Sequence, residues 1–213
     1  MLDPIIITGL PRSRTSLVTQ IMELSGVFLG QTLGVTKANP HGQLENIDII
    51  NKVQKKHLRE YGFDTKGQKP IPPLKWHAPD PNRKQKVFNI MKSHGLEDQI
   101  WGFKDAKACL DWRAWHEAFP NAYWIVTERN DADVIKSCLR TSFMTKYKDI
   151  KGWQYWIDEH KKRFQDMFNN LERIKKVNTD NLICYNFDAI EEIFEDLSLN
   201  FDYEKVYNQI QPI

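Results

Sequence analysis

The sequence predicts an α/β fold: a three-layer αβα arrangement around a central, mainly parallel sheet of about five strands. Two observations carry this prediction. Short apolar runs typical of buried strands alternate along the chain with helical patterns, and a strand, a tight loop and a helix follow one another between Pro4 and Leu29. Such alternation is typical of βαβ units, in which helices cover both faces of a parallel sheet.

The expected strands are short runs rich in apolar and β-branched residues. They are Ile5 to Thr8, Gly26 to Leu29, Ile100 to Lys104, Ala122 to Thr127 and Leu182 to Phe187. Apolar residues at helical spacing predict helices between and after these runs. They are Glu45 to Tyr61, Asn82 to His94, Trp153 to Ile174, Ala189 to Leu197 and Tyr203 to Ile210. We expect the tryptophans of the long amphipathic helix from Trp153 to act as core anchors.

A chain of 213 residues is long enough for one substantial core, so a single domain over residues 1–213 is expected. The stretch from Lys66 to Pro81 stands apart, because its five prolines exclude a regular helix or a central strand. Two interpretations remain open for this excursion: a lid over an acceptor site, or a plain surface loop.

The composition is that of an ordinary soluble globular protein, with 41% hydrophobic and 27% charged residues. A net charge of +2 is too small to argue for nucleic acid as a partner. No stretch approaches the roughly 20 apolar residues of a membrane-spanning helix. Cys109, Cys138 and Cys184 are expected as buried free thiols, which fit a reducing compartment. A cytoplasmic protein is therefore expected.

The loop after the first strand reads GLPRSRTS and has the composition of an anion site. Glycine permits a sharp turn, proline fixes φ, and hydroxyl side chains stand where the helix begins. Amides at the helix N-terminus and two guanidinium groups would converge on one phosphate. The residues concerned are Gly9, Pro11, Arg12, Ser13, Arg14, Thr15 and Ser16.

This loop differs from that of a nucleotide triphosphatase, which reads GxxxxGK followed by Ser or Thr. Aligning the two on Gly9 puts Arg14 at the second glycine and Thr15 at the lysine. A loop that keeps the helix terminus and the hydroxyls but lacks the lysine should bind a phosphate that is held and not cleaved. It should also need no metal.

The loop resembles that of the PAPS-dependent sulfotransferases, especially the small bacterial and viral-type members, where it runs GxPRSGTS. This resemblance implies a P-loop NTPase-like fold and 3′-phosphoadenosine 5′-phosphosulfate (PAPS) as the cofactor. It also implies that Arg12, Ser13, Thr15 and Ser16 bind the 5′-phosphate together with amides of the turn. Arg14 departs from the family, which has glycine at that position.

A second stretch, AYWIVTERNDADVIKSCLRTS, is also similar to this family. In the family, an Arg at the end of a strand is followed eight positions later by a Ser, and the pair binds the 3′-phosphate of PAPS. Arg129 and Ser137 have this spacing. Because Ser137 would lie about two turns along the next helix, both side chains can face one crevice. Asn130 and Asp131 replace the family's acidic residue and proline.

Three further segments extend the resemblance over most of the chain. Ala38 to Val53 is similar to the NPKGYFE segment of the small members, WGFKDAKACL from Trp101 to Leu110 is similar to their WGxKDPR strand, and FDAIEEIF is similar to their YEDL segment. By the same resemblance, Phe187 falls where the family has an aromatic residue near the adenine, although a core role accounts for it equally well.

Sulfuryl transfer needs a base near the acceptor and positive charge near the sulfonate. Glu45 is the first candidate for the base, since related branches place a glutamate there, and a helix-start carboxylate is the competing interpretation. Asp105 and His77 are the alternatives for the base. Lys104 is the candidate for stabilising charge on the sulfonate. Ala106 stands where cytosolic members have a catalytic His, so that mechanism does not carry over.

The resulting expectation is a sulfotransferase that moves a sulfuryl group from PAPS, in line and without a metal, to a hydroxyl or amine of a small-molecule or glycan acceptor. The sequence names neither the acceptor nor the oligomeric state. Two alternatives remain: a P-loop small-molecule or nucleotide kinase, and a catalytically inactive PAP-binding or nucleotide-binding module of the same fold.

Overall fold

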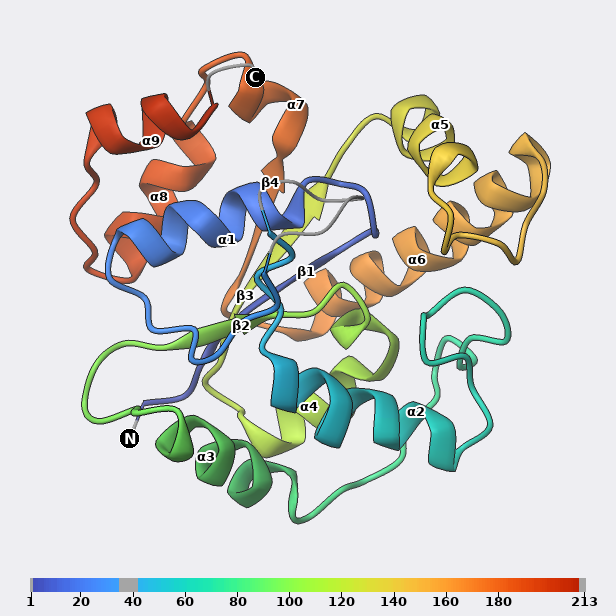
Figure 1. The fold of residues 1–213 in the computed structure, drawn as a ribbon, viewed down its shortest axis with the longest axis horizontal. Helices are drawn as coiled ribbons and strands as arrows, with labels where there is room; N and C mark the ends of the chain where they lie inside the picture. The colour runs from blue at the N-terminus through green and yellow to red at the C-terminus, as the bar shows by residue number, and fades with distance from the viewer. Residues whose placement is uncertain (1, 35–41, 211–213) are drawn as a thin grey trace.

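The computed structural model describes residues 2–34 and 42–210, and it confirms the predicted three-layer α/β architecture (Figure 1). The first four residues of the family-like segment that starts at Ala38 lie outside the described residues. Among the described residues the sheet has four strands, all parallel, in the order β2-β1-β3-β4. The strands are β1 (Ile5–Gly9), β2 (Gly102–Lys104), β3 (Tyr123–Glu128) and β4 (Ile174–Asn178).

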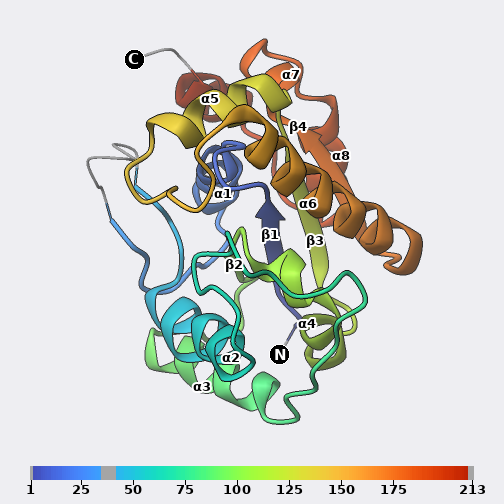
Figure 2. The ribbon, with the colours of Figure 1, turned by 90° about the vertical axis from the view of Figure 1, so that its right-hand side faces the viewer.

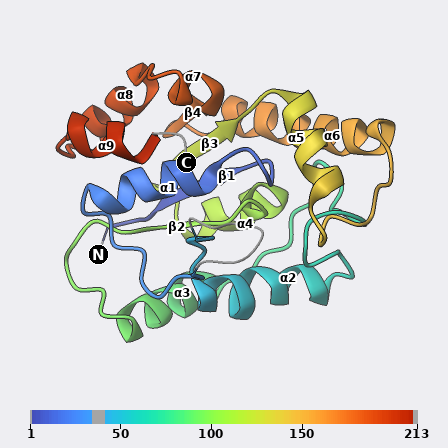
Figure 3. The ribbon, with the colours of Figure 1, turned by 45° about the horizontal axis from the view of Figure 1, so that its top comes forward.

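Helices cover both faces of this sheet. Figure 1 shows α1 lying across one face beside α8 and α9, and Figure 3 shows the C-terminal helices at the end of the molecule opposite α2 and α3. The helices are α1 (Thr15–Leu24), the π-helical η1 (Ile49–Gln54), α2 (Lys55–Glu60), α3 (Arg83–Ser93), the 3₁₀-helical η2 (Ala108–Asp111), α4 (Trp112–Ala118), α5 (Asp131–Arg140), α6 (Ile150–Asn170), α7 (Thr179–Ile183), α8 (Asp188–Asp196) and α9 (Tyr203–Ile210).

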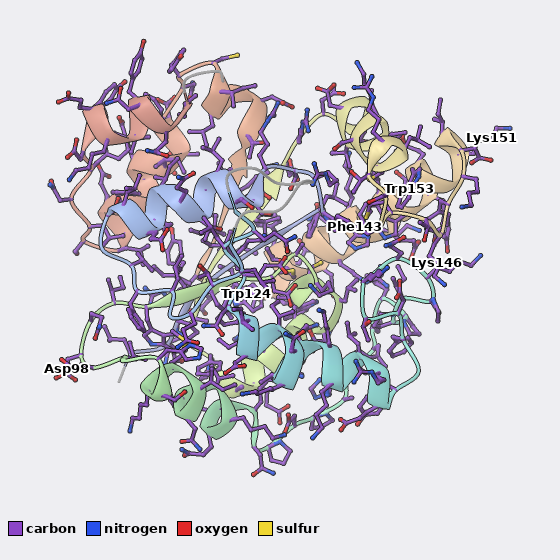
Figure 4. All side chains as sticks on the ribbon, in the orientation of Figure 1. Asp98, Trp124, Phe143, Lys146, Lys151 and Trp153 are labelled. Atoms are coloured by element: carbon purple, nitrogen blue, oxygen red, sulfur yellow. The ribbon has the colours of Figure 1, made fainter. Side chains whose placement is uncertain are left out.

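The two central strands are buried on both faces, and successive side chains enter different cores. Ile5 and Ile7 of β1 pack with the apolar residues of α1, α8 and α9. Ile6 lies on the other face and packs with the core formed by α3 to α6, which also holds Trp124 of β3. Figure 4 shows Trp124 near the centre of the molecule. This two-sided burial explains why both strands read as continuous apolar runs.

Two of the five expected strands are wrong. Leu182 to Phe187 is not a strand, because α7 begins at Thr179, where the side chain of Asn178 accepts hydrogen bonds from the amides of Asp180 and Asn181. Gly26 to Leu29 forms only a single parallel bridge, from Phe28 to Trp101. Glycines with positive φ, Gly26 and Gly30, flank this short run and limit its pairing.

The last strand of the sheet, β4, was assigned partly to the preceding helix by sequence. The expected helix ran to Ile174, whereas α6 ends at Asn170 and Ile174 begins β4. Only Val177 of β4 is fully buried, since the strand lies at the edge of the sheet and carries two lysines. The predicted core role of Trp153 and Trp156 is confirmed, because both side chains are fully buried.

The proline-rich excursion is tied to the rest of the protein at several points. The side chain of Gln68 donates to the carbonyl of Phe143 and accepts from the amide of Thr145. Trp156 donates to the carbonyl of Gly67, and Arg163 donates to that of Pro72. These bonds favour an ordered loop over a lid that swings open.

Cys109 and Cys138 are buried free thiols, as expected, but Cys184 is exposed, so the expectation of three buried thiols is wrong for it. Its segment turns at the end of α7 and is not the buried strand that the sequence suggested. Across the described parts of the chain, none of the helices combines the length and apolar character that crossing a membrane requires.

Candidate active site

The site is built where β1 ends and the chain turns into α1 (Figure 2). Gly9, the last residue of β1, has φ +150°, and a Cβ there would lie 2.2 Å from Oγ1 of Thr127 on the neighbouring strand β3. Only glycine therefore allows β1 to lie this close to β3 at the point where the loop starts. Gly9 shapes the loop by its lack of a side chain.

Arg14, which stands where similar loops have glycine, adopts a backbone conformation that glycine favours. It is the N-cap residue of α1, in the left-handed region at φ 59° and ψ 31°, which costs about 1–2 kcal/mol for a residue other than glycine. Its guanidinium Nη1 lies 2.6 Å from Oδ1 of Asp180. The side chain of Arg14 makes no capping hydrogen bond to the first amides of α1. These amides therefore receive no side-chain cap from the N-cap residue.

The hydroxyl residues of the loop have different roles. Ser13 is fully buried, donates from Oγ to the carbonyl of Leu10 at 2.6 Å and lies 2.7 Å from Oγ1 of Thr127, so its hydroxyl holds the loop together. Thr15 and Ser16 line a cavity in front of the loop. Ser16 also donates to the carbonyl of Gln43 at 3.2 Å.

The second predicted phosphate-binding pair lies directly against this loop. Nε of Arg12 donates to Oγ of Ser137 at 2.9 Å, although the two residues are 125 positions apart. Nη1 of Arg129 donates to the carbonyl of Arg12 at 3.1 Å, while its buried Nε has no hydrogen-bond partner among the described residues. Burial and the neighbouring Arg14 lower the pKa of Arg129. Asp133 and Asp180 lie 3.7 Å and 3.9 Å from its guanidinium and balance part of this positive charge. A buried N–H that makes no hydrogen bond to a described residue, next to Arg12 and Arg14, is suited to binding an anion.

The cavity in front of the loop has a volume of about 610 Å³, and its charge is strongly positive. Among the described residues that line it, seven side chains are cationic and one, Glu45, is acidic. The cations are Arg12, Arg14, Lys55, Lys66, Lys104, Lys107 and Arg129. Such an imbalance within a protein of nearly neutral net charge indicates a site for an anionic ligand.

Glu45 and Lys104 meet in this cavity. Oε1 of Glu45 lies 3.3 Å from Nζ of Lys104, which also donates to the carbonyl of Gln43 at 2.6 Å. Burial alone would raise the pKa of Glu45, but Lys107, Lys104 and Lys55 outweigh it and hold the pKa below its usual 4.5. Glu45 is therefore a carboxylate at neutral pH, the form a general base requires.

Asp105 is placed differently from Glu45. Its side chain is fully buried outside the cavity lining, and Oδ1 accepts from Nζ of Lys107 at 2.5 Å and from the amide of Lys107 at 2.8 Å. Asp105, with help from Glu45, raises the pKa of Lys107 against the effect of burial. Asp105 thus positions Lys107, which does line the cavity.

Sequence reasoning missed Lys107, although a signal was available. In the segment WGFKDAK, this lysine stands where the similar WGxKDPR strand has an arginine, so a comparison of the two segments at this position would have indicated a cation.

Two other candidate residues lie away from the cavity lining. His77 is partly exposed, and its Nε2 is 3.5 Å from Oε2 of Glu117. Phe187 is buried, and the centroid of its ring lies 4.9 Å from that of Tyr203. The structure therefore favours a core role for Phe187. Among the described residues His77 does not line the cavity in which an acceptor molecule would meet Glu45.

The fold and the site together define a class of protein: parallel α/β proteins that bind a phosphate-like anion in the loop after the first strand. The model of the sulfotransferase family matches residues 4–202. The chain therefore belongs to the sulfotransferase family. Among curated protein sequences, no match was found.

Solved sulfotransferase structures share this fold. The sulfotransferase domain from the curacin biosynthetic pathway has a TM-score of 0.60 at 14% identity, over 100% of this chain and 79% of that one. The sulfotransferase domain of the olefin synthase from Synechococcus PCC 7002 has a TM-score of 0.59 at 16% identity, over 100% and 78%. Mouse sulfotransferase SULT7A1, solved in complex with PAP, has a TM-score of 0.53 at 10% identity, over 98% and 64%.

Proposed function

We propose that this protein transfers a sulfuryl group from PAPS to a hydroxyl or amine of an acceptor molecule. One observation carries the proposal most strongly. Arg129 lines the same cavity as the anion-binding loop, and Arg12 of the loop is hydrogen-bonded both to Arg129 and to Ser137. A donor with two separate anionic groups, such as PAPS, matches this double site.

The residues present fit such a donor. The amides at the start of α1, with Thr15 and Ser16, supply donors for a 5′-phosphate. Arg129 and Ser137 supply donors for a 3′-phosphate, and Arg12, which the resemblance assigned to the 5′-phosphate, joins them because its Nε already lies 2.9 Å from Oγ of Ser137. Nε of Arg129 makes no hydrogen bond within the described part of the chain and lies 3.9 Å from Oδ1 of Asp180, so it can donate to an oxygen of this phosphate. The similar mouse enzyme was solved with PAP, which supports the same ligand here.

In the proposed reaction, PAPS supplies the sulfonate on a phosphate oxygen. Glu45 accepts the proton of the acceptor hydroxyl or amine as that group attacks. Lys104, 3.3 Å from Glu45, stabilises negative charge on the sulfonate and on the departing phosphate oxygen. Lys107 adds a second cation on the same side, held in place by Asp105.

Ligand binding tests the donor site. We expect the protein to bind PAP more tightly in calorimetry than adenosine 5′-phosphosulfate, because only PAP carries the 3′-phosphate. Arg129→Ala and Ser137→Ala should weaken the binding of PAP by roughly tenfold or more and leave the affinity for adenosine 5′-phosphosulfate nearly unchanged. Arg59→Ala is the control, since this arginine is exposed on α2 and lines neither of the two cavities that Arg129 borders.

Two results would contradict the assignment. An equal loss of affinity for PAP and for adenosine 5′-phosphosulfate would show that Arg129 and Ser137 do not bind the 3′-phosphate. Tight binding of ATP with magnesium and no response to PAP would favour a kinase. Transfer of labelled sulfate from PAPS to a panel of hydroxyl and amine acceptors separates an active enzyme from an inactive binding module.

A further inference from the structure

The cavity holds more positive charge than a PAPS donor requires. Arg12 and Arg129 are assigned to the 3′-phosphate and Lys104 and Lys107 to the side of the sulfonate, while Arg14 is paired with Asp180. Two cations of the lining remain, Lys55 and Lys66. Resting on the proposed function, we propose that these two lysines form a subsite for an oxyanion of the acceptor, so that the acceptor is an acid carrying a carboxylate or a similar group near its reactive hydroxyl or amine.

Lys55 differs from the other lysines of its helical segment. Lys52 pairs with Asp48 at 2.9 Å and Lys56 with Glu60 at 3.8 Å, each one turn away. Nζ of Lys55 instead donates to the neutral side chain of Asn51 at 3.0 Å, and no carboxylate among the described residues lies within ion-pair distance of it. The ammonium group of Lys55 thus lines the cavity without a direct ion pair to a described residue, and Glu45 is the acidic residue of the same lining.

The backbone before Lys55 is wound in a way that recurs at functional sites. The segment η1 is π-helical, and the amide of Lys55 donates to the carbonyl of Ile50, five residues earlier. A π-turn holds one residue more than an α-turn, so it changes which side chains of the following helix face the cavity. Here Gln54 is buried beneath the site and Lys55 lines it.

Lys66 approaches from the proline-rich excursion, whose backbone is fixed here. The carboxylate of Asp64 accepts hydrogen bonds from the amides of Lys66 at 3.2 Å and Gln68 at 3.0 Å. Gln68 in turn binds the carbonyl of Phe143, which also lines the cavity. Figure 4 shows Phe143 in the connection between α5 and α6. Lys66 therefore lies on a segment of the cavity wall whose backbone is held by hydrogen bonds, and Phe143 lines the same cavity.

The subsite lies close to the proposed base. Lys55 and Glu45 line the same cavity, and the charge of Lys55 is one of those that hold the pKa of Glu45 low. An acceptor whose oxyanion lies at Lys55 and Lys66 would present its hydroxyl to Glu45 only if few bonds separate the two groups. Phe143 and Met144 add an apolar wall, which suits a compact ring carrying both groups.

Matched acceptor pairs test this proposal with labelled PAPS. The probes are 4-hydroxybenzoate against its methyl ester and glucuronate against glucose, each pair differing only in or near the anionic group. We expect the acid of at least one pair to be preferred by about tenfold or more in kcat/KM. Lys55→Met and Lys66→Met should raise KM for that acid by about tenfold and leave the neutral partner unchanged. Lys56→Met is the control.

A binding measurement covers the case in which no probe is sulfated. Calorimetry of 4-hydroxybenzoate and glucuronate on the PAP-saturated protein should show binding that Lys55→Met weakens. If neither acid binds, or if neutral acceptors are preferred, the proposal is overturned. Loss of PAP affinity in Lys55→Met and Lys66→Met would also overturn it, because the lysines would then serve the donor. Failure of the proposed function itself would appear separately, as a wild-type protein that binds no PAP.

Discussion

Glu45→Gln is the substitution that most directly tests the chemistry of the site. It removes the proton-accepting carboxylate while keeping the size of the side chain and an oxygen that can accept from Lys104, 3.3 Å away. Loss of a general base typically costs about 10²- to 10⁴-fold in rate. We therefore expect kcat for sulfuryl transfer to fall by that factor, which corresponds to about 3–5 kcal/mol in the activation free energy.

The effect on folding should be smaller than the effect on rate. Lys104 is buried and loses its counter-charge, but the Gln oxygen preserves a hydrogen-bond acceptor, so a cost of about 1–3 kcal/mol in the free energy of unfolding is expected. Glu45→Ala, which leaves the ammonium of Lys104 without that acceptor, should cost about 3–5 kcal/mol. Denaturant unfolding of the two variants measures the difference.

The pH dependence follows from the low pKa of Glu45. A carboxyl group whose pKa is lowered on folding contributes stability above its unfolded value, and this contribution is lost as pH falls through the folded value. For Glu45 that loss begins below its usual 4.5, so the transfer rate should not respond to this group near neutral pH. Glu45→Gln should remove this acid-side component from the stability profile.

The assay is transfer of labelled sulfate at saturating PAPS, with the affinity for PAP measured by calorimetry on the same protein. The affinity for PAP should be kept or improved, since a negative charge is removed from an anion site. Glu60→Gln, a surface glutamate paired with Lys56, is the control. A transfer rate in Glu45→Gln within about threefold of wild type would refute the role of Glu45 as the base.

Three other substitutions probe the framework of the site. Gly9→Ala should lower the free energy of unfolding by about 1–3 kcal/mol, because the new Cβ would lie 2.2 Å from Oγ1 of Thr127. Thermal unfolding measures this effect, and an unchanged melting temperature would contradict it. Arg14→Gly should change the free energy of unfolding by no more than about 1 kcal/mol. The partly exposed ion pair with Asp180 is lost, while glycine removes the strain of the left-handed backbone conformation. The affinity of this variant for PAP, measured by calorimetry, should change far less than that of Arg129→Ala. His160 is buried, and burial lowers its pKa to about 3, so the free energy of unfolding should fall as pH decreases from 6.5 toward 3. His160→Gln should flatten this dependence of the free energy of unfolding on pH, measured by urea unfolding. An unaltered slope would count against this effect of burial.

Local pattern was sufficient for the elements whose burial is uniform. β1 and β3 lie inside the sheet with both faces covered, so each is a continuous apolar run, and each was predicted within a residue or two. The edge strand β4, IKKVN, has only one fully buried residue, and the sequence pattern predicts no strand there; the expected helix ended on its first residue, Ile174. Its position beside β3 depends on long-range pairing that no local periodicity reveals.

The amino-acid sequence was enough to predict the loop between β1 and α1 as an anion site and to single out the pair Arg129 and Ser137, because loop chemistry and helical spacing are local properties. The tertiary structure decided what these residues contact. Arg12 reaches Ser137 because β1 and β3 are neighbours in the sheet, and Arg14 turns to Asp180 because β4 follows β3. Contacts of this kind depend on the order of the strands, which brings together residues more than a hundred positions apart.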